Sequence, residues 1–353
     1  MASAVPKPVD LARVLAVVAL AAALVVAAAG GATASTVRTT GVTLSGAGST
    51  FVAPLVAKWV PAFSAAFGDD IAYNPIGSGA GISAITGRTV DFGASDAPLS
   101  PAQFSACNGC VQIPWALSAT SVPYNLPGVK NLLHMDGPTL AKMYLGQITH
   151  WNDPAIQKLN PGVALPSTAI TIAHRSDDSG TTFNFTDYLS SVSPEWNQKY
   201  GAGVNVTWPV GVPGRGSGGM VSIITQTVGA VGYIDAAYSL ANHLKYFAMR
   251  NRAGAFTPPG LKGILAAASS NFHPTTDNVF SIVNPPAKFK AAYPISTYTY
   301  VIVPVKTPKA SDLRKFIFWA VTKGQAYGPP LLFAPIPKVA LVVAEKAISR
   351  IGS

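Results

Sequence analysis

The chain has 353 residues, of which 11% are charged and 49% are hydrophobic, and its net charge is +10. A positive balance favours anionic partners, but the sequence has no block of lysine and arginine, no aromatic RNA-binding signature and no zinc-finger spacing. It also lacks the G-x-x-x-x-G-K-[ST], H-E-x-x-H and G-x-S-x-G patterns of ATPases, zinc proteases and α/β-hydrolases. We therefore expect a protein that binds no nucleic acid, metal or cofactor and has no enzymatic activity.

The first part of the chain predicts an export signal. Lys7 and Arg13 precede an uncharged apolar run over residues 14–29, and Ala32-Thr-Ala34 fits a small-x-small cleavage site. We expect a signal peptide over residues 1–34 and an exported protein, in the periplasm or on the outer face of the cytoplasmic membrane. Removing this segment changes the net charge from +10 to +9, which still favours the approach of anions. Retention of the segment as an anchor is the alternative.

A glycine-rich loop early in the mature chain predicts the start of a helix. Residues 44–50 lead into residues 51–67, where large apolar residues recur every four positions. Gly68 is the expected end of this helix, and Pro61 is expected to kink or break it. The first backbone N–H groups of such a helix have no partner within the helix and favour an anion.

A second segment repeats this arrangement. Residues 71–76 predict an extended run, residues 77–81 a loop of small residues, and residues 82–85 a short helical turn.

Cys107 and Cys110 are the two cysteines of the chain. A C-x-x-C pair fits a redox centre, half of a zinc site or a local disulfide. Because the chain has no second cysteine pair and its five histidines are scattered, a disulfide in an oxidising compartment is the preferred interpretation.

A third helix start has the strongest anion-binding character. Residues 169–173 predict a buried strand, and helical spacing follows from Phe183. Ser179 therefore stands near an N-cap, Gly180 leaves the first N–H groups open, and Arg175 adds a planar fork suited to two oxygens of a tetrahedral anion. The same residues fit a capped turn with a surface ion pair, and this segment alone does not separate the two interpretations.

Several motifs, in their order along the chain, resemble the signatures of the phosphate-binding proteins of ABC-type phosphate importers. The resemblance extends over roughly residues 41–337. Its most specific parts are Val-Asp-Phe-Gly-Ala-Ser-Asp at 90–96 and the Arg-x-Asp-x-Ser-Gly-Thr pattern that begins at Arg175. The full set comprises residues 46–51, 76–79, 89–99, 144–146, 151–153, 175–183, 208–209 and 229–233.

The resemblance implies an α/β protein with the two-lobed type II periplasmic-binding-protein fold. In that fold each lobe is a mixed β-sheet flanked by helices, and a hinge between the lobes closes on a ligand. Residues 41–121 and 296–342 are then expected to form lobe 1, residues 122–295 lobe 2, and residues 343–353 a C-terminal tail. The crossings between lobes are expected near residues 122–124 and 293–297.

The resemblance also implies the ligand and its contacts. Phe51 and Gly180 are expected to offer backbone N–H groups, and Asp177 to pair with the arginine and orient it. The implied function is capture of inorganic phosphate and delivery to the permease subunits of an importer with a separate ATPase, by a monomer. The full set of implied phosphate contacts is Thr50, Phe51, Ser78, Asp96, Arg175, Ser179, Gly180 and Thr181.

Asp96 is the residue expected to select phosphate. Hydrogen phosphate has a proton to donate to a carboxylate, whereas fully ionised sulfate has none and would be disfavoured by roughly 2–5 kcal/mol. The alternative structural role of Asp96 is an N-cap before Ala97-Pro98. The alternative functions are binding of another oxyanion (sulfate, molybdate or arsenate), which Asp96 disfavours, and a secreted phosphatase-like protein, for which no nucleophile with a base is recognisable.

Two places depart from the resemblance. The family commonly has glycine where Asp178 stands, so the effect of this residue depends on whether its charge faces the ligand or solvent. The loop at residues 214–219 also differs, and Arg215 is therefore not included in the site. His174 is expected to fill space rather than to catalyse, because no serine and acid are recognisable as its partners.

Overall fold

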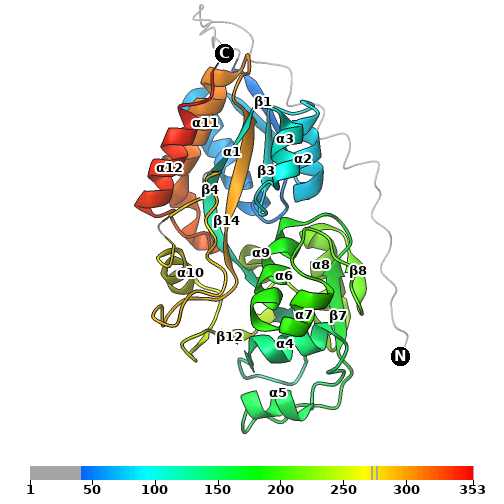
Figure 1. Cartoon of the computed structure of the whole chain (residues 1–353). Coiled ribbons are helices and arrows are strands. Elements are labelled where there is room, and N and C mark those ends of the chain that lie inside the picture. The colour runs from blue at the N-terminus through cyan, green and yellow to red at the C-terminus, as the bar shows by residue number, and fades with distance from the viewer. Residues whose placement is uncertain (1–40, 272, 276, 353) are drawn as a thin grey trace, which may run out of the picture. The chain divides into compact units, whose positions relative to one another are not determined.

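The computed structural model describes residues 41–271, 273–275 and 277–352 (Figure 1). The signal peptide expected over residues 1–34 lies outside the described residues. Within the described chain, helices alternate with strands that form three sheets. The α/β class expected from the sequence is confirmed.

The largest sheet has six strands and is mixed. Its strands β1, β2 and β3 are parallel to one another, whereas β14 runs antiparallel to β3 and β4, and β10 runs antiparallel to β4. In spatial order the strands are β10 (Ile234–Asp235), β4 (Cys110–Ser121), β14 (Ser296–Pro304), β3 (Phe92–Ser95), β1 (Thr43–Gly48) and β2 (Asp70–Asn74).

Helices from both ends of the chain pack on this sheet. Helix α2 packs on β1 and β3, α1 on β2, and α9, α10, α11 and α12 on β4. Helix α3 joins β3 to β4. Their bounds are α1 (Ala53–Phe67), α2 (Ser78–Thr86), α3 (Pro101–Cys107), α9 (Ala236–Ala241), α10 (Leu261–Ala268), α11 (Ala310–Val321) and α12 (Lys338–Ile348), with the 3-10 turns η1 (Lys323–Tyr327) and η2 (Pro329–Leu331).

The second sheet has five strands and is also mixed. Strand β7 lies parallel to its neighbours β8 and β9, while β5 pairs antiparallel with β9 and β11. Its order is β11 (Lys245–Tyr246), β5 (Pro123–Tyr124), β9 (Ala230–Val231), β7 (Thr171–Arg175) and β8 (Val212–Gly214). The helices of this part are α4 (Gly137–Tyr144), α5 (Pro154–Leu159), α6 (Gly180–Val192), α7 (Pro194–Lys199) and α8 (Gly216–Gln226).

The chain passes directly between the two sheets. Strand β4 ends at Ser121 in the six-stranded sheet, and β5 begins at Pro123 in the five-stranded sheet. Strands β9 and β10 make a further passage, since β10 joins the six-stranded sheet although it belongs to the range 122–295 assigned to lobe 2. A third small sheet contains β13 (Phe256–Thr257), β12 (Ala248–Arg250) and β6 (His134–Met135). The division into lobes at 121/122 and 295/296 stays a prediction.

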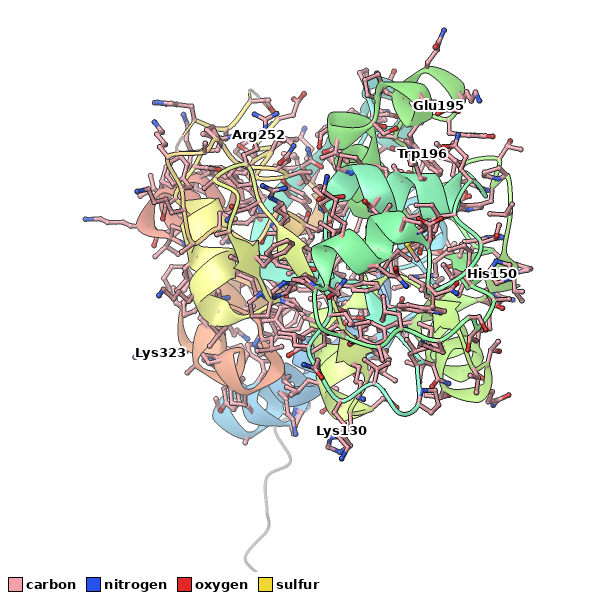
Figure 2. The ribbon with its side chains drawn as sticks, turned by 90° about the horizontal axis from the view of Figure 1, so that it is seen from below. Lys130, His150, Glu195, Trp196, Arg252 and Lys323 are labelled. Atoms are coloured by element: carbon pink, nitrogen blue, oxygen red, sulfur yellow. A yellow bond between two sulfur atoms is a disulfide. The ribbon has the colours of Figure 1, made fainter. Side chains whose placement is uncertain are left out.

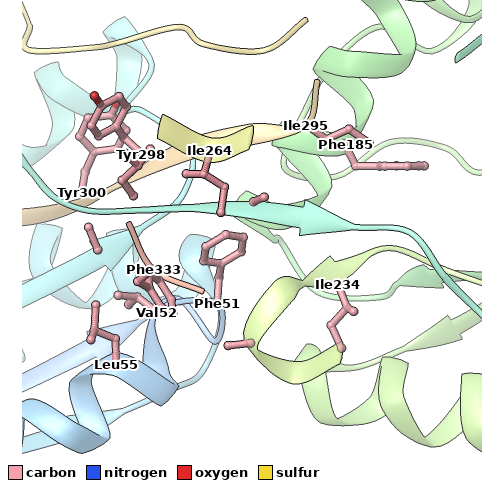
Figure 3. Packing of buried hydrophobic residues seen from close by; sticks show 14 of the residues in the cluster. Phe51, Val52, Leu55, Phe185, Ile234, Ile264, Ile295, Tyr298, Tyr300 and Phe333 are labelled. Carbon is pink, nitrogen blue, oxygen red and sulfur yellow. The ribbon is translucent and has the colours of Figure 1, made fainter. Parts of the chain in front are cut away.

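Helix α1 shows why the apolar spacing produces a helix at this position. Leu55, Trp59 and Phe63 are fully buried on one face, and Gly68 ends the helix in the left-handed conformation with φ of 75°. Pro61 does not break the helix. We attribute this to the core contacts of Trp59 and Phe63 on either side, which offset the cost of about 3 kcal/mol for an internal proline. Figure 3 shows Val52 and Leu55 of this region packed with Phe333.

The C-terminal segment differs from the expected tail over residues 343–353. Residues 338–348 form helix α12, which packs on β4 and buries Ala344, Ala347 and Ile348. The last described residue, Gly352, donates its N–H to the carbonyl of Val305 at 2.7 Å. The sequence did not predict this packed helix because the buried face of α12 consists largely of alanines. The spacing of apolar residues does not distinguish such a face from that of a surface segment.

The charged residues lie mainly at the periphery of the described chain. Lys130, Arg252 and Lys323 extend outward from the ribbon in Figure 2 and are exposed. Among the described residues, no helix has the length and apolar character needed to cross a membrane.

Cys107 and Cys110 form the disulfide expected from the sequence. The guanidinium of Arg88 covers it, donating to the carbonyls of Cys107 at 2.8 Å and Asn108 at 3.0 Å. The disulfide belongs to a small apolar cluster between α2, α3 and β14 and contacts none of the residues predicted to bind phosphate.

Candidate anion-binding site

The predicted site residues come from loops at the carboxyl ends of parallel strands. Strand β1 ends at Gly48, before Ser49 and Thr50; β3 ends at Ser95, before Asp96; and β7 ends at Arg175 itself. Because parallel strands place these ends at one edge of a sheet, ligands of open α/β sheets bind there. The structure then brings the loops of the two larger sheets into direct contact.

Two backbone contacts join the loops of the two sheets. Gly79, in the first turn of α2, donates its N–H to the carbonyl of Asp178 at 3.0 Å. Gly180, the first residue of α6, lies so close to Asp96 that an added Cβ would be 2.7 Å from the Cβ and backbone nitrogen of that residue. A side chain at position 180 would therefore separate the arginine loop from the Asp96 loop.

Asp96 is buried and accepts hydrogen bonds from two serines. Ser49 Oγ donates to Oδ1 at 2.5 Å, and Ser78 Oγ donates to Oδ2 at 3.4 Å. Burial raises the pKa of Asp96 to about 7, although the Ser49 hydrogen bond and the charge of Arg175 oppose this shift. The interpretation of Asp96 as an N-cap is wrong, because the following helix α3 is capped by Ser100 instead.

Arg175 is held in place by one carboxylate. Its Nε donates to Asp177 Oδ1 at 2.7 Å and its Nη2 to Asp177 Oδ2 at 2.5 Å, while Gly216 also donates its N–H to Oδ1 at 2.9 Å. Burial raises the pKa of Asp177, but Arg175 outweighs this and holds the pKa below its ordinary value. The guanidinium has five N–H donors, of which these bonds use two, so a fixed donor edge remains available to an anion.

The N-terminus of α6 carries the features of an anion site. Ser179 is the N-cap, as expected, and its Oγ accepts the N–H of Thr182 at 3.2 Å. The hydroxyl of Thr181 is buried and has no hydrogen-bond partner among the described residues. A buried hydroxyl without a partner costs free energy unless a water or a ligand binds it. This helix start therefore offers both backbone and side-chain donors.

Thr50 and Phe51 precede α1, whose N-cap is Val52. Thr50 Oγ1 lies 2.9 Å from Ser217 Oγ, a hydroxyl of α8. The N–H of Phe51 donates to Ser49 Oγ at 3.0 Å, so Ser49 competes with a ligand for this donor. The ring of Phe51 is buried against Phe333, with ring centroids 6.0 Å apart (Figure 3).

Asp178 stands where the family commonly has glycine, and its side chain lies beside Gly79 of α2. Its side chain is exposed, and its Oδ1 accepts a hydrogen bond from Asn205 Nδ2 at 3.0 Å. Solvent therefore screens its charge from an anion bound at α6. Gly79 provides the space for the Asp178 side chain, since a Cβ at Gly79 would lie 2.3 Å from the Cβ of Asp178.

Arg215 and His174 lie outside the candidate site. Arg215 is exposed at the N-cap position of α8. His174 stacks on Trp208 with ring centroids 5.0 Å apart, and partial burial lowers its pKa. Both placements agree with the roles expected from the sequence. Among the described residues, no group of histidine, cysteine, aspartate and glutamate is arranged to hold a metal ion.

The sequence did not identify three buried residues beside the site: Ser49, Ser217 and Asp235. Ser49 stands directly before Thr50 and could have been found as a second hydroxyl in the same loop. Ser217 lies in residues 214–219, which depart from the resemblance and were expected to form a loop; in the structure α8 begins at Gly216. Asp235 follows the motif at residues 229–233, but its position beside Asp96 results from the pairing of β10 with β4.

Two cavities lie near these loops. One of about 80 Å³ is bounded by Asp96, Asn184 and Asp187 together with residues of β14. An apolar groove of about 660 Å³ runs between α1 and α9 and contains none of the residues predicted to bind phosphate. The polar cluster around Asp96 and Arg175 is therefore the better anion site.

Comparisons with known proteins show which family this chain belongs to. A model of the PBP superfamily domain matches residues 30–323. A phosphate-binding protein PstS of Xylella fastidiosa is 40% identical over 304 residues, covering 85% of this chain and 83% of the relative. The chain therefore belongs to the PstS family of phosphate-binding proteins.

Two further proteins show the breadth of the similarity. The phosphate-binding protein PstS of Pasteurella multocida is 35% identical, with 84% of this chain and 87% of the relative covered. The crystal structure of a phosphate-binding protein from Stenotrophomonas maltophilia is 18% identical, with a TM-score of 0.67 over 86% of this chain and 93% of that one. The periplasmic-binding-protein fold expected from the sequence is confirmed.

Proposed function

We propose that this protein captures inorganic phosphate between its two larger sheets and delivers it to the membrane subunits of an ABC-type phosphate importer. Membership of the PstS family supports the delivery step and the exported location. We choose phosphate as the ligand because a buried carboxylate, that of Asp96, lies beside a cluster of donors that includes Arg175. Hydrogen phosphate fits both, because it accepts several hydrogen bonds and has one proton to give.

We assign the phosphate contacts to Thr50, Phe51, Ser78, Asp96, Arg175, Ser179, Gly180 and Thr181. The charge of Arg175 and the donors of the α6 N-terminus would hold the anionic oxygens. Asp96 would accept the proton of the ligand and reject a fully ionised tetrahedral anion. The loops of the two sheets would stay in contact around a bound ligand, because Gly79 and Gly180 have no side chains to hold them apart.

Calorimetric titration of the mature protein with phosphate and with sulfate at neutral pH tests the proposal. We expect phosphate to bind more tightly, and Asp96→Asn to reduce the preference over sulfate by about 100-fold because the repulsion of sulfate is removed. Arg175→Ala should weaken phosphate binding by about 2–5 kcal/mol, since a buried charge contact is lost. Arg215→Ala is the matched control: an exposed arginine of the neighbouring loop, expected to change affinity by less than about twofold. Tighter binding of sulfate by the unmodified protein would refute the proposal.

A further inference from the structure

The first turn of helix α8 contacts both sides of the proposed phosphate site. Its first residue, Gly216, donates its N–H to Asp177 Oδ1 at 2.9 Å, and Asp177 in turn holds the guanidinium of Arg175. The next residue, Ser217, places its Oγ 2.9 Å from Thr50 Oγ1. Gly216 also lies beside this threonine, since a Cβ at Gly216 would be 3.6 Å from Thr50 Cγ2. One helix start therefore adjoins site residues that belong to each of the two larger sheets.

The hydrogen bond between Thr50 and Ser217 crosses from one sheet to the other. Thr50 follows β1 of the six-stranded sheet, and Ser217 follows β8 of the five-stranded sheet. Ser217 is 1% exposed and Thr50 is 9% exposed, so water competes little for the two hydroxyls. A hydrogen bond of this kind contributes about 0.5–1.5 kcal/mol. It does so only while the loops of the two sheets are in contact.

The number of hydroxyl protons fixes the direction of this bond when phosphate is bound. Either hydroxyl is able to donate to the other, but each has only one proton. Thr50 is assigned as a donor to the phosphate oxygens, so its bond with Ser217 must be donated by Ser217. A Thr50 that donated to Ser217 instead would turn its lone pairs toward the anion.

We propose that Ser217 is a positioning residue that donates its proton to Thr50 and so directs the Thr50 proton at bound phosphate. This inference rests on the proposed phosphate site and adds to it a residue that makes no contact with the ligand. Because the same bond joins the two sheets, phosphate binding and contact between the loops favour each other. Residues 214–219, which depart from the family resemblance, thereby contribute to the site in this chain.

A double-mutant cycle on phosphate affinity tests the inference. Ser217→Ala removes the donor to Thr50, and we expect phosphate to bind about 3- to 10-fold more weakly, the range for one neutral hydrogen bond. Thr50→Val removes the partner hydroxyl and keeps its shape, so in that background Ser217→Ala should cause no further loss. An equal loss in both backgrounds, or no loss in the unmodified background, would overturn the proposal.

Two further serine variants separate the hydroxyl of Ser217 from a general effect on α8. Ser222→Ala is the matched control, because it makes the same substitution at an exposed position of the same helix. It should change the affinity by less than about twofold. Ser217→Thr keeps a hydroxyl at position 217 and should bind phosphate more tightly than Ser217→Ala. Equal losses in these two variants of Ser217 would contradict its role as a donor.

Urea denaturation of each variant without phosphate shows whether it is folded. If Ser217→Ala does not fold, Ser217→Gly also lacks the hydroxyl and takes its place in the cycle with Thr50→Val, with the same expected outcomes. Failure of the unmodified protein to bind phosphate would instead contradict the proposed function.

Discussion

The aspartates at this site differ in burial and in pKa. Asp96 and Asp235 are enclosed and have raised pKa values, whereas Asp177 is paired with Arg175 and has a lowered pKa. Asp178 is adjacent in sequence but exposed. Carboxylates close in space thus differ in pKa, pairing and exposure, depending on their surroundings.

Asp178→Gly tests whether the departure from the family pattern changes binding. Because the side chain is exposed and bonded to Asn205, we expect the phosphate dissociation constant to change by less than about twofold at physiological ionic strength. Asp177→Asn, one position away, is the comparison. It leaves Arg175 without its charged partner and should weaken binding by about tenfold or more. A large gain in affinity from Asp178→Gly would show that its charge reaches the ligand.

The positions where a helix begins after a strand were the part of the fold that the sequence predicted best. The apolar spacing and the capping serine predicted the N-terminal regions of α1 and α6, since each depends on residues close together in the chain. The start of α2 was predicted too late, because this helix begins at Ser78, inside the residues 77–81 that were expected to form a loop. The position of Asp235 was not accessible in this way. It depends on the pairing of the two-residue strand β10 with β4, which joins segments distant in sequence.

Substitutions in α12 test whether this helix belongs to the folded core. Ile348 is 6% exposed, and Ile348→Ala should lower the free energy of unfolding by about 2–4 kcal/mol through lost burial and a cavity. Val342 of the same helix is 53% exposed, and Val342→Ala should cost less than about 0.5 kcal/mol. Urea denaturation of both variants measures the difference. Equal and small effects would indicate a tail that contributes little to stability, as the sequence alone suggested.

At the scale of the whole molecule, acidic groups enclosed by folding make stability depend on pH. Asp96, Asp187 and Asp235 have raised pKa values, in each case mainly because of burial. A carboxyl whose pKa is higher in the folded than in the unfolded state binds more protons when folded. Its stabilising contribution is therefore present at low pH and is lost as the pH rises through the folded pKa.

Other groups have the opposite dependence. Asp91 and Asp177 have lowered pKa values: burial opposes this, and Lys309 and Arg175 respectively overcome it. Their contributions are present above the ordinary carboxyl pKa and are lost below it, at about pH 4 and lower. Burial lowers the pKa of His174, so its contribution is present above about pH 6.5 and is lost as the pH falls. The half-buried histidine offsets only part of the effect of the enclosed carboxyls.

We therefore expect the phosphate-free protein to be more stable at pH 5 than at pH 8, by a few kcal/mol. Urea denaturation at the two pH values in phosphate-free buffer measures the difference. Asp96→Asn should reduce it, because the pKa of Asp96 is about 7 and this residue accounts for part of the proton uptake in this range. Equal stability at the two pH values, or greater stability at pH 8, would mean that these carboxyls are hydrated in the ligand-free protein. The two larger sheets would then stand apart until phosphate binds, since opening of the loops around Asp96 is the direct way for water to reach it.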